Sequence, residues 1–340
     1  MRTITLDKPG QFSWVETPGG YDRLAPTEAR VRVRRVGICG TDLHAFKGEQ
    51  PFFTYPRVLG HELGVEVVGV GEQAGALRAG DRCAVEPYLS CGRCIACRKG
   101  KTNCCERLQV LGVHADGGMR ELMTLPADKL HKSAALSLDQ LALVEPLSIG
   151  AHAVARARVE AGECALVVGA GPIGLSVIQF AQLAGARVLV LDVNEERLDF
   201  ARAHFSLEAA IRAGDGAVAE IKRITGGDLP TAVFDATGNR QSMNASFDLP
   251  AHGGRLILVG LFQGDLTFHD PDAHRRELTL LCSRNATGAD FKRVIGLLEA
   301  GAVDVKPWIT HRVSFGIDVL EQFPLWLDPQ SHFIKAVIEV

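Results

Sequence analysis

The sequence predicts an α/β protein of two domains, an irregular β-rich domain followed by a doubly wound parallel sheet. The chain has 340 residues, and a single hydrophobic core rarely grows past about 250–300 residues. Residues 29–36 read ARVRVRRV, an alternation of apolar and charged residues that is typical of a strand with one solvated face. After residue 145, short apolar runs alternate with segments of helical periodicity, a pattern typical of parallel sheets.

The first domain is predicted over residues 1–148, with short strands broken by glycine and proline. Besides residues 29–36, residues 65–70 and 82–86 have the composition of strands. Five cysteines fall within a lobe of about residues 86–109, and four of them are candidate ligands of one metal ion. We expect the loops of this domain to carry any metal ligands.

The second domain is predicted over residues 149–284. Its expected strands cover residues 165–168, 187–192, 232–235, 254–260 and 278–282, with helices over 173–184 and 195–204. The first of these strands is continuously apolar, as expected when both faces of a sheet are covered. Residues 285–340 should add a helix near residues 290–300 and a strand over 334–339 that returns to the first domain.

Composition excludes several classes of protein. A net charge of -3 gives no bulk attraction for nucleic acid or an anionic membrane. No apolar run approaches the roughly 20 residues of a membrane-spanning helix. The first ten residues lack the hydrophobic core of a signal peptide. Nine cysteines without such a signal suggest reduced thiols that serve as metal ligands, so we expect a cytoplasmic protein.

The cysteine lobe is the most specific motif in the chain. Cys91, Cys94 and Cys97 are followed by Cys105 in the spacing C-x2-C-x2-C-x7-C. Four thiolates that close in sequence suit one tetrahedral zinc with no open position, which is a structural site. Spacing alone leaves Cys104 as an alternative fourth ligand.

A second and more varied set of ligands lies upstream. Cys39, His61 and Glu62 offer sulfur, nitrogen and oxygen, too few for a closed site, and they suit a catalytic zinc that keeps a position open for substrate. Glu145 is a second carboxylate candidate, because it lies at the boundary of the two domains, where ligand pockets tend to form. Whether Glu62 or Glu145 completes the ligand set is open.

Two further side chains near these ligands are candidate catalytic residues. Thr41 and His44 lie just after Cys39, and they could pass the proton released from a substrate toward solvent. His44 could instead be a surface residue without a catalytic role.

Residues 169–174 read GAGPIG, follow an apolar strand and open a helix, as a dinucleotide-binding turn should. Gly169 permits the turn, Gly171 lets a pyrophosphate approach the backbone, and Gly174 lets helix and strand pack closely. The helix, which begins with Pro172 and Ile173, would direct its N-terminus at the phosphates.

An acidic residue stands at the distance that this motif requires. Asp192 lies 21 residues after Gly171 and ends the next strand. Its carboxylate would accept hydrogen bonds from ribose hydroxyls and repel a 2′-phosphate, so NAD is preferred over NADP. Asp192 could otherwise be an ordinary turn residue.

Together these motifs resemble the zinc-containing medium-chain dehydrogenase/reductase superfamily over essentially the whole chain. In family order they are GHE at 60–62, the cysteine lobe, DGG at 116–118, EPL at 145–147, the glycine motif and Asp192. The resemblance implies a GroES-like β domain plus a Rossmann domain, and it assigns Cys105 as the fourth ligand of the lobe. The EPL motif resembles the sorbitol and threonine dehydrogenase branch, which implies a polyol or hydroxy-acid substrate.

A closer likeness is to the bacterial L-galactonate 5-dehydrogenase group, whose members oxidise a sugar acid with NAD. It rests on residues 50–61, 102–106, 112–114, 259–262 and 283–287. The resemblance implies that Arg284 binds a substrate carboxylate, although a structural salt bridge is the alternative for this residue. Candidate pocket residues, which could equally have a packing role, are Phe53, Tyr55 and His114. Implied cofactor contacts are Arg197, Thr237, Val259 and, near the phosphates, Lys335.

The predicted reaction is NAD-dependent oxidation of a secondary hydroxyl on a sugar acid or polyol. Zinc would acidify the hydroxyl as a Lewis acid, and NAD would accept the hydride. Members of this family are commonly homodimers or homotetramers. The alternatives are a sorbitol-, fucose- or threonine-type dehydrogenase of the same family, a zinc-free quinone reductase, and a non-catalytic nucleotide-binding protein. The intact set of ligands opposes the last two.

Overall fold

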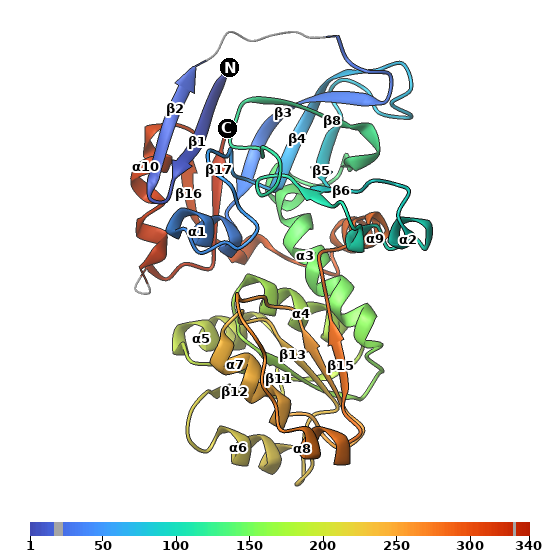
Figure 1. The fold of residues 1–340 in the computed structure, drawn as a ribbon, viewed down its shortest axis with the longest axis vertical. Coiled ribbons are helices and arrows are strands. Elements are labelled where there is room, and N and C mark those ends of the chain that lie inside the picture. The colour runs from blue at the N-terminus through green and yellow to red at the C-terminus, as the bar shows by residue number, and fades with distance from the viewer. Residues whose placement is uncertain (17–22, 329–330) are drawn as a thin grey trace. The chain divides into compact units, whose positions relative to one another are not determined.

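The computed structural model describes residues 1–16, 23–328 and 331–340, and it divides the chain into two compact units. The first unit comprises Met1–Glu145 and Ala286–Val340, and the second comprises Pro146–Asn285. Each unit is built on its own sheet (Figure 1). Among the described residues, no helix is both long enough and apolar enough to cross a membrane.

The first unit contains a seven-stranded sheet in the order β16-β17-β3-β4-β5-β9, with β8 also paired to β3. Its strands are β3 (Glu28–Gly37), β4 (Glu62–Val70), β5 (Arg82–Val85), β8 (Leu122–Pro126), β9 (Leu130–Lys132), β16 (Ile309–Ser314) and β17 (Lys335–Glu339). The last strand, β17, pairs antiparallel with β3, so that Val337 lies opposite Gly37. The C-terminal strand β17 therefore belongs to the same sheet as β3.

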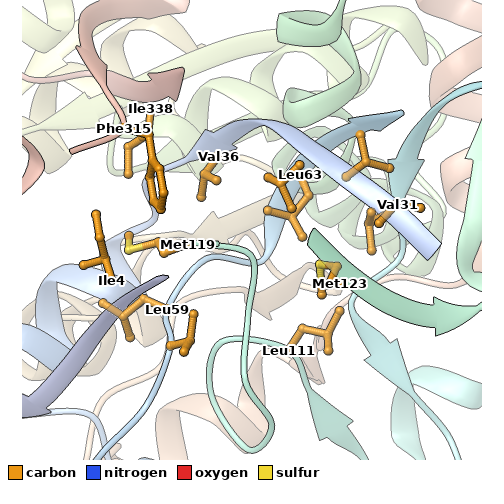
Figure 2. Close-up of a cluster of buried hydrophobic side chains, with 14 of the residues drawn as sticks. Ile4, Val31, Val36, Leu59, Leu63, Leu111, Met119, Met123, Phe315 and Ile338 are labelled. Carbon is orange, nitrogen blue, oxygen red and sulfur yellow. The ribbon is translucent and has the colours of Figure 1, made fainter. Parts of the chain in front are cut away.

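The apolar residues of β3 build the core of this unit. Val31, Val33 and Val36 are fully buried. The register against β4 shifts between Val33 and Arg35, so the alternation resumes one residue later. Figure 2 shows Val31 and Val36 within one cluster of buried side chains that also contains Ile4, Leu63 and others from neighbouring segments. Each fully buried side chain of this size contributes roughly 1.5–3 kcal/mol of hydrophobic stabilisation.

Shorter elements surround the sheet of the first unit. They are the hairpin β1 (Arg2–Lys8) and β2 (Gln11–Glu16), the pair β6 (Tyr88–Leu89) and β7 (Gln109–Val110), and the helices α1 (Gly40–Lys47), α2 (Ile95–Arg98), α9 (Gly288–Glu299) and α10 (Ile317–Gln322). Because β6 and β7 pair antiparallel, the cysteine lobe between them is closed at its base.

The second unit is a six-stranded parallel sheet in the order β12-β11-β10-β13-β14-β15. Its strands are β10 (Cys164–Val168), β11 (Arg187–Asp192), β12 (Ala209–Arg212), β13 (Ala232–Asp235), β14 (Arg255–Leu258) and β15 (Thr279–Cys282). Its helices include α4 (Pro172–Leu183), α5 (Glu195–His204), α6 (Ala217–Ile224), α7 (Arg240–Ala245) and α8 (Asp270–Arg275). The predicted doubly wound sheet is confirmed, and its strand order reverses at β10.

One long helix was not predicted from the sequence. α3 (Leu138–Ala157) continues through Pro146, where the pattern suggested only a change of character. A proline inside a helix removes a hydrogen bond and costs about 3 kcal/mol. Full burial of Leu141, Leu143 and Leu147 offsets this cost, because each apolar side chain is removed from water.

A buried ion cluster lies beside the base of the cysteine lobe. Lys129 Nζ donates to Glu86 Oε1 at 2.6 Å, and His131 Nε2 lies 3.0 Å from Glu86 Oε2. The His131 ring stacks on Phe291 of α9, with centroids 5.2 Å apart. All three members of the cluster are buried, so each depends on the others for hydrogen bonds.

We expect Glu86→Gln to lower stability at neutral pH by about 3 kcal/mol, because it leaves Lys129 buried without its counterion. Burial alone would raise the pKa of Glu86, but hydrogen bonds from His131 and Lys129 outweigh it and lower the pKa below 4.5. A lowered folded-state pKa contributes stability above the unfolded value, and this stability is lost as the pH falls through the folded value. Urea unfolding at several pH values should therefore show a steeper loss below 4.5 in the wild type than in Glu86→Gln. Glu220→Gln, which removes an exposed pair with Arg223, should change the pH dependence far less than Glu86→Gln, because exposed ion pairs contribute little to stability.

Candidate metal centres and nucleotide site

Cys39, His61 and Glu62 meet where β3 ends and β4 begins. The two strands run antiparallel with Gly37 opposite Glu62, so the residues that follow β3 and those that begin β4 are neighbours. Ligand atoms of the three side chains lie within 4.8 Å of one another. A Cβ on Gly37 would lie 2.1 Å from Glu62 Oε2, so only glycine allows this close approach.

The charges around these residues fit a divalent cation. Asp42, His61, Glu62 and Glu145 are all buried in the same region. Burial raises the pKa of Asp42, and it raises the pKa of Glu145 to about 7, so their negative charges are incompletely compensated. Asp42 Oδ1 and His61 Nδ1 lie 3.7 Å apart, and neither has a hydrogen-bond partner among the described residues. A zinc ion held by the thiolate, imidazole and carboxylate ligands would compensate this charge.

The carboxylate of Glu62 is bound by Lys335. Lys335 Nζ donates to Glu62 Oε1 at 2.7 Å, to Glu62 Oε2 at 2.8 Å and to the carbonyl oxygen of Ile38 at 3.0 Å. An ammonium has three protons, so all of them have acceptors within the first unit. This geometry opposes the prediction that Lys335 binds cofactor phosphates, which took no account of its buried place in β17 beside Glu62.

Glu145, the other candidate carboxylate, accepts a hydrogen bond from the hydroxyl of Tyr88. Its charge also interacts with that of His61, which connects it to the same centre. The structure therefore brings both carboxylates to this region, each with a different partner.

Thr41 and His44 lie on α1, the helix that Cys39 caps. His44 is 61% exposed, and its Nδ1 lies 3.1 Å from Glu49 Oε2. Thr41 is half-buried, one turn earlier. An exposed histidine beside a buried centre can exchange protons with water, so the geometry is compatible with the predicted proton transfer.

Sequence reasoning did not identify Asp42 or Tyr88. Asp42 Oδ2 accepts a hydrogen bond from the backbone N–H of Cys39 at 2.9 Å, and its other oxygen faces His61. An acid three residues after Cys39, in the first turn of a helix, was the available signal. Tyr88 carried no comparable signal, since its partner is far away in sequence.

The four cysteines of the lobe are brought together by the structure. The sulfurs of Cys91, Cys94, Cys97 and Cys105 all lie within 4.8 Å of one another, whereas Cys104 is exposed. The backbone N–H groups of Cys91 and Arg107 donate to Cys105 Sγ at 3.2 and 3.3 Å. The geometry thus selects Cys105 over Cys104.

The protonation of these thiols also suits a metal. Hydrogen bonds from the backbone of Cys97 and Glu106 lower the pKa of Cys94 to about 6, which favours the thiolate that zinc binds. Desolvation raises the pKa of Cys97 to about 11, and a bound zinc would have to replace its proton. Four sulfur donors within 4.8 Å of one another fit a closed structural zinc.

The glycine motif forms the turn between β10 and α4. Gly169 has φ +95°, which favours glycine. A Cβ on Gly174 would lie 1.7 Å from the carbonyl oxygen of Gly169, so this position admits no side chain. Gly171 caps α4, and Pro172 and Ile173 begin its first turn. The free N–H groups of that turn are suited to bind a pyrophosphate.

Asp192 ends β11 next to this turn. Its Oδ2 accepts from the backbone N–H of Ala170 at 2.6 Å, and its Oδ1 accepts from Asn194 at 2.8 Å. Asp192 therefore also holds the glycine turn, a role that was not predicted. Two carboxylate oxygens have about four acceptor sites, so hydrogen bonds to ribose remain possible.

The remaining predicted cofactor residues lie along the same edge of the sheet. Thr237 follows β13 and donates to Asp235, Val259 follows β14, and Arg197 is in the first turn of α5. Ligands bind at the carboxyl ends of strands in such sheets, so the structure brings these side chains to the expected edge.

The predicted substrate residues lie in both units. Arg284 is exposed, just after the end of β15. Phe53 and Tyr55 are half-buried, pack edge to face at 4.8 Å and contact the core of the first unit. His114 Nδ1 accepts from the backbone N–H of Val110 at 3.2 Å, and its ring lies 6.3 Å from that of Phe52.

Comparison with known proteins identifies the family to which the chain belongs. Residues 25–135 match the alcohol dehydrogenase GroES-like domain, and residues 172–300 match the zinc-binding dehydrogenase family. L-Galactonate-5-dehydrogenase of Escherichia coli (strain K12) is 41% identical and covers 99% of this chain and 98% of that protein. 2-Dehydro-3-deoxy-L-galactonate 5-dehydrogenase of Pseudoalteromonas atlantica is 33% identical, covering 92% of this chain and 91% of that protein.

A solved structure extends the likeness to three dimensions. The crystal structure of the RspB alcohol dehydrogenase from E. coli CFT073 in complex with NADH has a TM-score of 0.92 and 32% identity, and covers 100% of this chain and 99% of that chain. The predicted fold class and family resemblance are confirmed. The chain belongs to the zinc-containing medium-chain dehydrogenase/reductase superfamily and is an alcohol dehydrogenase with zinc and NAD as its cofactors.

Proposed function

We propose that the chain oxidises a secondary hydroxyl of a sugar acid, with L-galactonate as the favoured substrate and its C5 hydroxyl as the reacting group. The observation that carries this proposal is the 41% identity to L-galactonate-5-dehydrogenase over nearly the full length of both chains. A second relative, at 33% identity, also acts at C5 of a sugar acid according to its name.

The residues of the chain have distinct roles in this proposal. Cys39, His61 and either Glu62 or Glu145 would hold the catalytic zinc, while Cys91, Cys94, Cys97 and Cys105 would hold the structural one. Zinc supplies Lewis acidity toward the substrate hydroxyl, and NAD accepts hydride. Thr41 and His44 would carry the released proton toward water. Gly169, Gly171, Gly174 and Asp192 would orient the cofactor.

Arg284 would bind the substrate carboxylate. A guanidinium presents two parallel N–H groups to a carboxylate, which fixes the acid end of the substrate. A hydrogen bond to a charged group contributes about 1.5–3 kcal/mol. Replacing Arg284 with methionine should therefore raise KM for an aldonate more than KM for a neutral polyol.

The deciding experiment is NAD reduction by the zinc-loaded protein with a panel of substrates. L-Galactonate and its neutral amide form a matched pair that differs only in the carboxylate. Other aldonates, sorbitol, L-threonine, fucose and simple alcohols test the alternatives. Preference for L-galactonate over its amide supports the proposal. Equal rates, or preference for a neutral polyol, would reject the sugar acid and the role of Arg284 while leaving a zinc dehydrogenase.

Replacing Asp192 with alanine should weaken NAD binding more than NADP binding, because the repulsion of a 2′-phosphate is lost together with the ribose hydrogen bonds. The substitution also removes the hydrogen bond to Ala170, which affects both cofactors alike. The ratio of the two dissociation constants, measured by fluorescence titration, is therefore the informative quantity. Asp192→Asn, which keeps an oxygen acceptor, is the matched control. An unchanged ratio in Asp192→Ala would remove the specificity role.

We further propose that the protein is a homodimer or homotetramer, and that β15 contributes to the interface. β15 lies at the edge of its sheet, and an edge strand presents unpaired backbone groups to another strand. Leu280 in this strand is 43% exposed. Replacing Leu280 with arginine should lower the mass measured by light scattering to that of a smaller species. Leu325→Arg, a control at an exposed leucine of the first unit, should leave the mass unchanged.

A cytoplasmic location is proposed because thiolate ligands require reduced cysteines.

A further inference from the structure

The two carboxylates near His61 are held by partners of different charge. Glu62 accepts hydrogen bonds through both oxygens from the ammonium of Lys335, so its charge is already compensated. Glu145 is bound by the neutral hydroxyl of Tyr88. That hydrogen bond orients Glu145 but adds no positive charge, and it leaves a second carboxylate oxygen for another partner.

The position of Tyr88 is fixed by its surroundings. The residue is 2% exposed and belongs to β6, where it lies opposite Val110 of β7. Its ring packs edge to face against Phe291, with centroids 6.2 Å apart and planes at 79°. A buried phenol requires a hydrogen-bond partner, and Glu145 provides it. The hydroxyl of Tyr88 is therefore a rigid support for the carboxylate.

We propose that Tyr88 is a positioning residue of the catalytic metal centre, which holds one oxygen of Glu145 so that the other completes the ligand set of Cys39 and His61. Glu62 also lies with these two residues in one compact group of ligand atoms, but its charge is already compensated by Lys335. This inference rests on the zinc-dependent function proposed above. It adds a side chain outside the ligand set and decides between Glu62 and Glu145.

The test compares metal binding in the wild type, Tyr88→Phe, Glu145→Gln and the double variant. The affinity of the catalytic metal is measured by competition with a chromophoric chelator, and its geometry by the visible spectrum of the cobalt-substituted protein. Thr231→Val is the matched control, because it removes a hydroxyl that donates to Glu163 at 2.6 Å in the second unit.

We expect Tyr88→Phe to weaken the catalytic metal by about 10–100-fold, as is typical for partners of metal ligands. Its cobalt spectrum should change in the same direction as that of Glu145→Gln. If Tyr88 acts through Glu145, the double variant should bind metal as weakly as Glu145→Gln alone, because the two effects are not additive. Wild-type metal affinity in Tyr88→Phe, or full additivity in the double variant, would overturn the proposal. Thr231→Val should match the wild type.

A second measurement applies even if Tyr88→Phe fails to fold. The chain has three tyrosines, so protein labelled with 3-fluorotyrosine gives few fluorine resonances. Removal of the catalytic zinc, or Glu145→Gln, should shift the resonance of Tyr88. An unmoved resonance would reject the proposal. Metal binding and the fluorine resonance are both measured without a substrate. These tests of Tyr88 therefore remain interpretable if the substrate panel rejects the sugar-acid proposal. The substrate panel likewise remains interpretable if the tests reject the role of Tyr88.

Discussion

Replacing Cys39 with serine should abolish dehydrogenase turnover while leaving NAD binding nearly intact. Serine keeps the size of the side chain but loses the thiolate, the ligand that zinc prefers. Lewis-acid stabilisation of a transition state amounts to several kcal/mol, and each 1.36 kcal/mol is a tenfold change in rate. We therefore expect the rate to fall by at least about 10³-fold. Metal analysis should show that the zinc content falls from two ions per chain to one.

Two controls separate this effect from general damage. Cys104→Ser changes an exposed cysteine outside both clusters and should retain zinc, stability and turnover. NAD titration of Cys39→Ser tests the second unit, which contains the glycine turn and Asp192. Full activity in Cys39→Ser would remove Cys39 from the catalytic centre.

The parts of the structure that were predicted correctly have signals that are local in sequence. The apolar run of β10, followed by glycines and a helix, predicts a dinucleotide-binding turn, because strands buried on both faces are continuously apolar and the glycine spacing follows directly. The cysteine spacing is equally local. In both cases, a few neighbouring residues determine the geometry.

The features that were not predicted depend on contacts distant in sequence. Lys335 was interpreted as a phosphate ligand, yet its ammonium binds Glu62, 273 residues away. Tyr88 and Glu145 are 57 residues apart. Helix α3 continues through Pro146 because its apolar side chains are buried, and burial by other segments is not visible in a local pattern. A single sequence does not show which residues far apart in the chain are in contact. It therefore predicts which residue types bind a metal, but not which side chain positions each metal ligand.

The second large effect concerns the structural zinc. Replacing Cys94 with serine should release the zinc of the lobe and lower the free energy of unfolding by more than about 4 kcal/mol, since loss of a metal belongs to the most destabilising class of substitutions. Apparent binding energies of structural zinc are about 10–16 kcal/mol in small zinc-binding peptides. Ile95, the first residue of the short helix α2 in the lobe, is 49% exposed, so packing alone would not hold the lobe. Thermal unfolding and metal analysis check this expectation, with Cys104→Ser again as the control.

We expect Cys94→Ser to affect the catalytic metal centre as well as the cysteine lobe. Tyr88 lies three residues before Cys91, in the strand pair that closes the lobe. If the lobe loses its zinc, Tyr88 loses the support of β7, and Glu145 loses its hydrogen bond. Cys94→Ser should therefore weaken the catalytic metal as well, by an amount similar to that of Tyr88→Phe. Cobalt at the catalytic centre of Cys94→Ser should then show the spectrum of Tyr88→Phe. A wild-type spectrum and affinity there would mean that the lobe stabilises the first unit without acting on the centre.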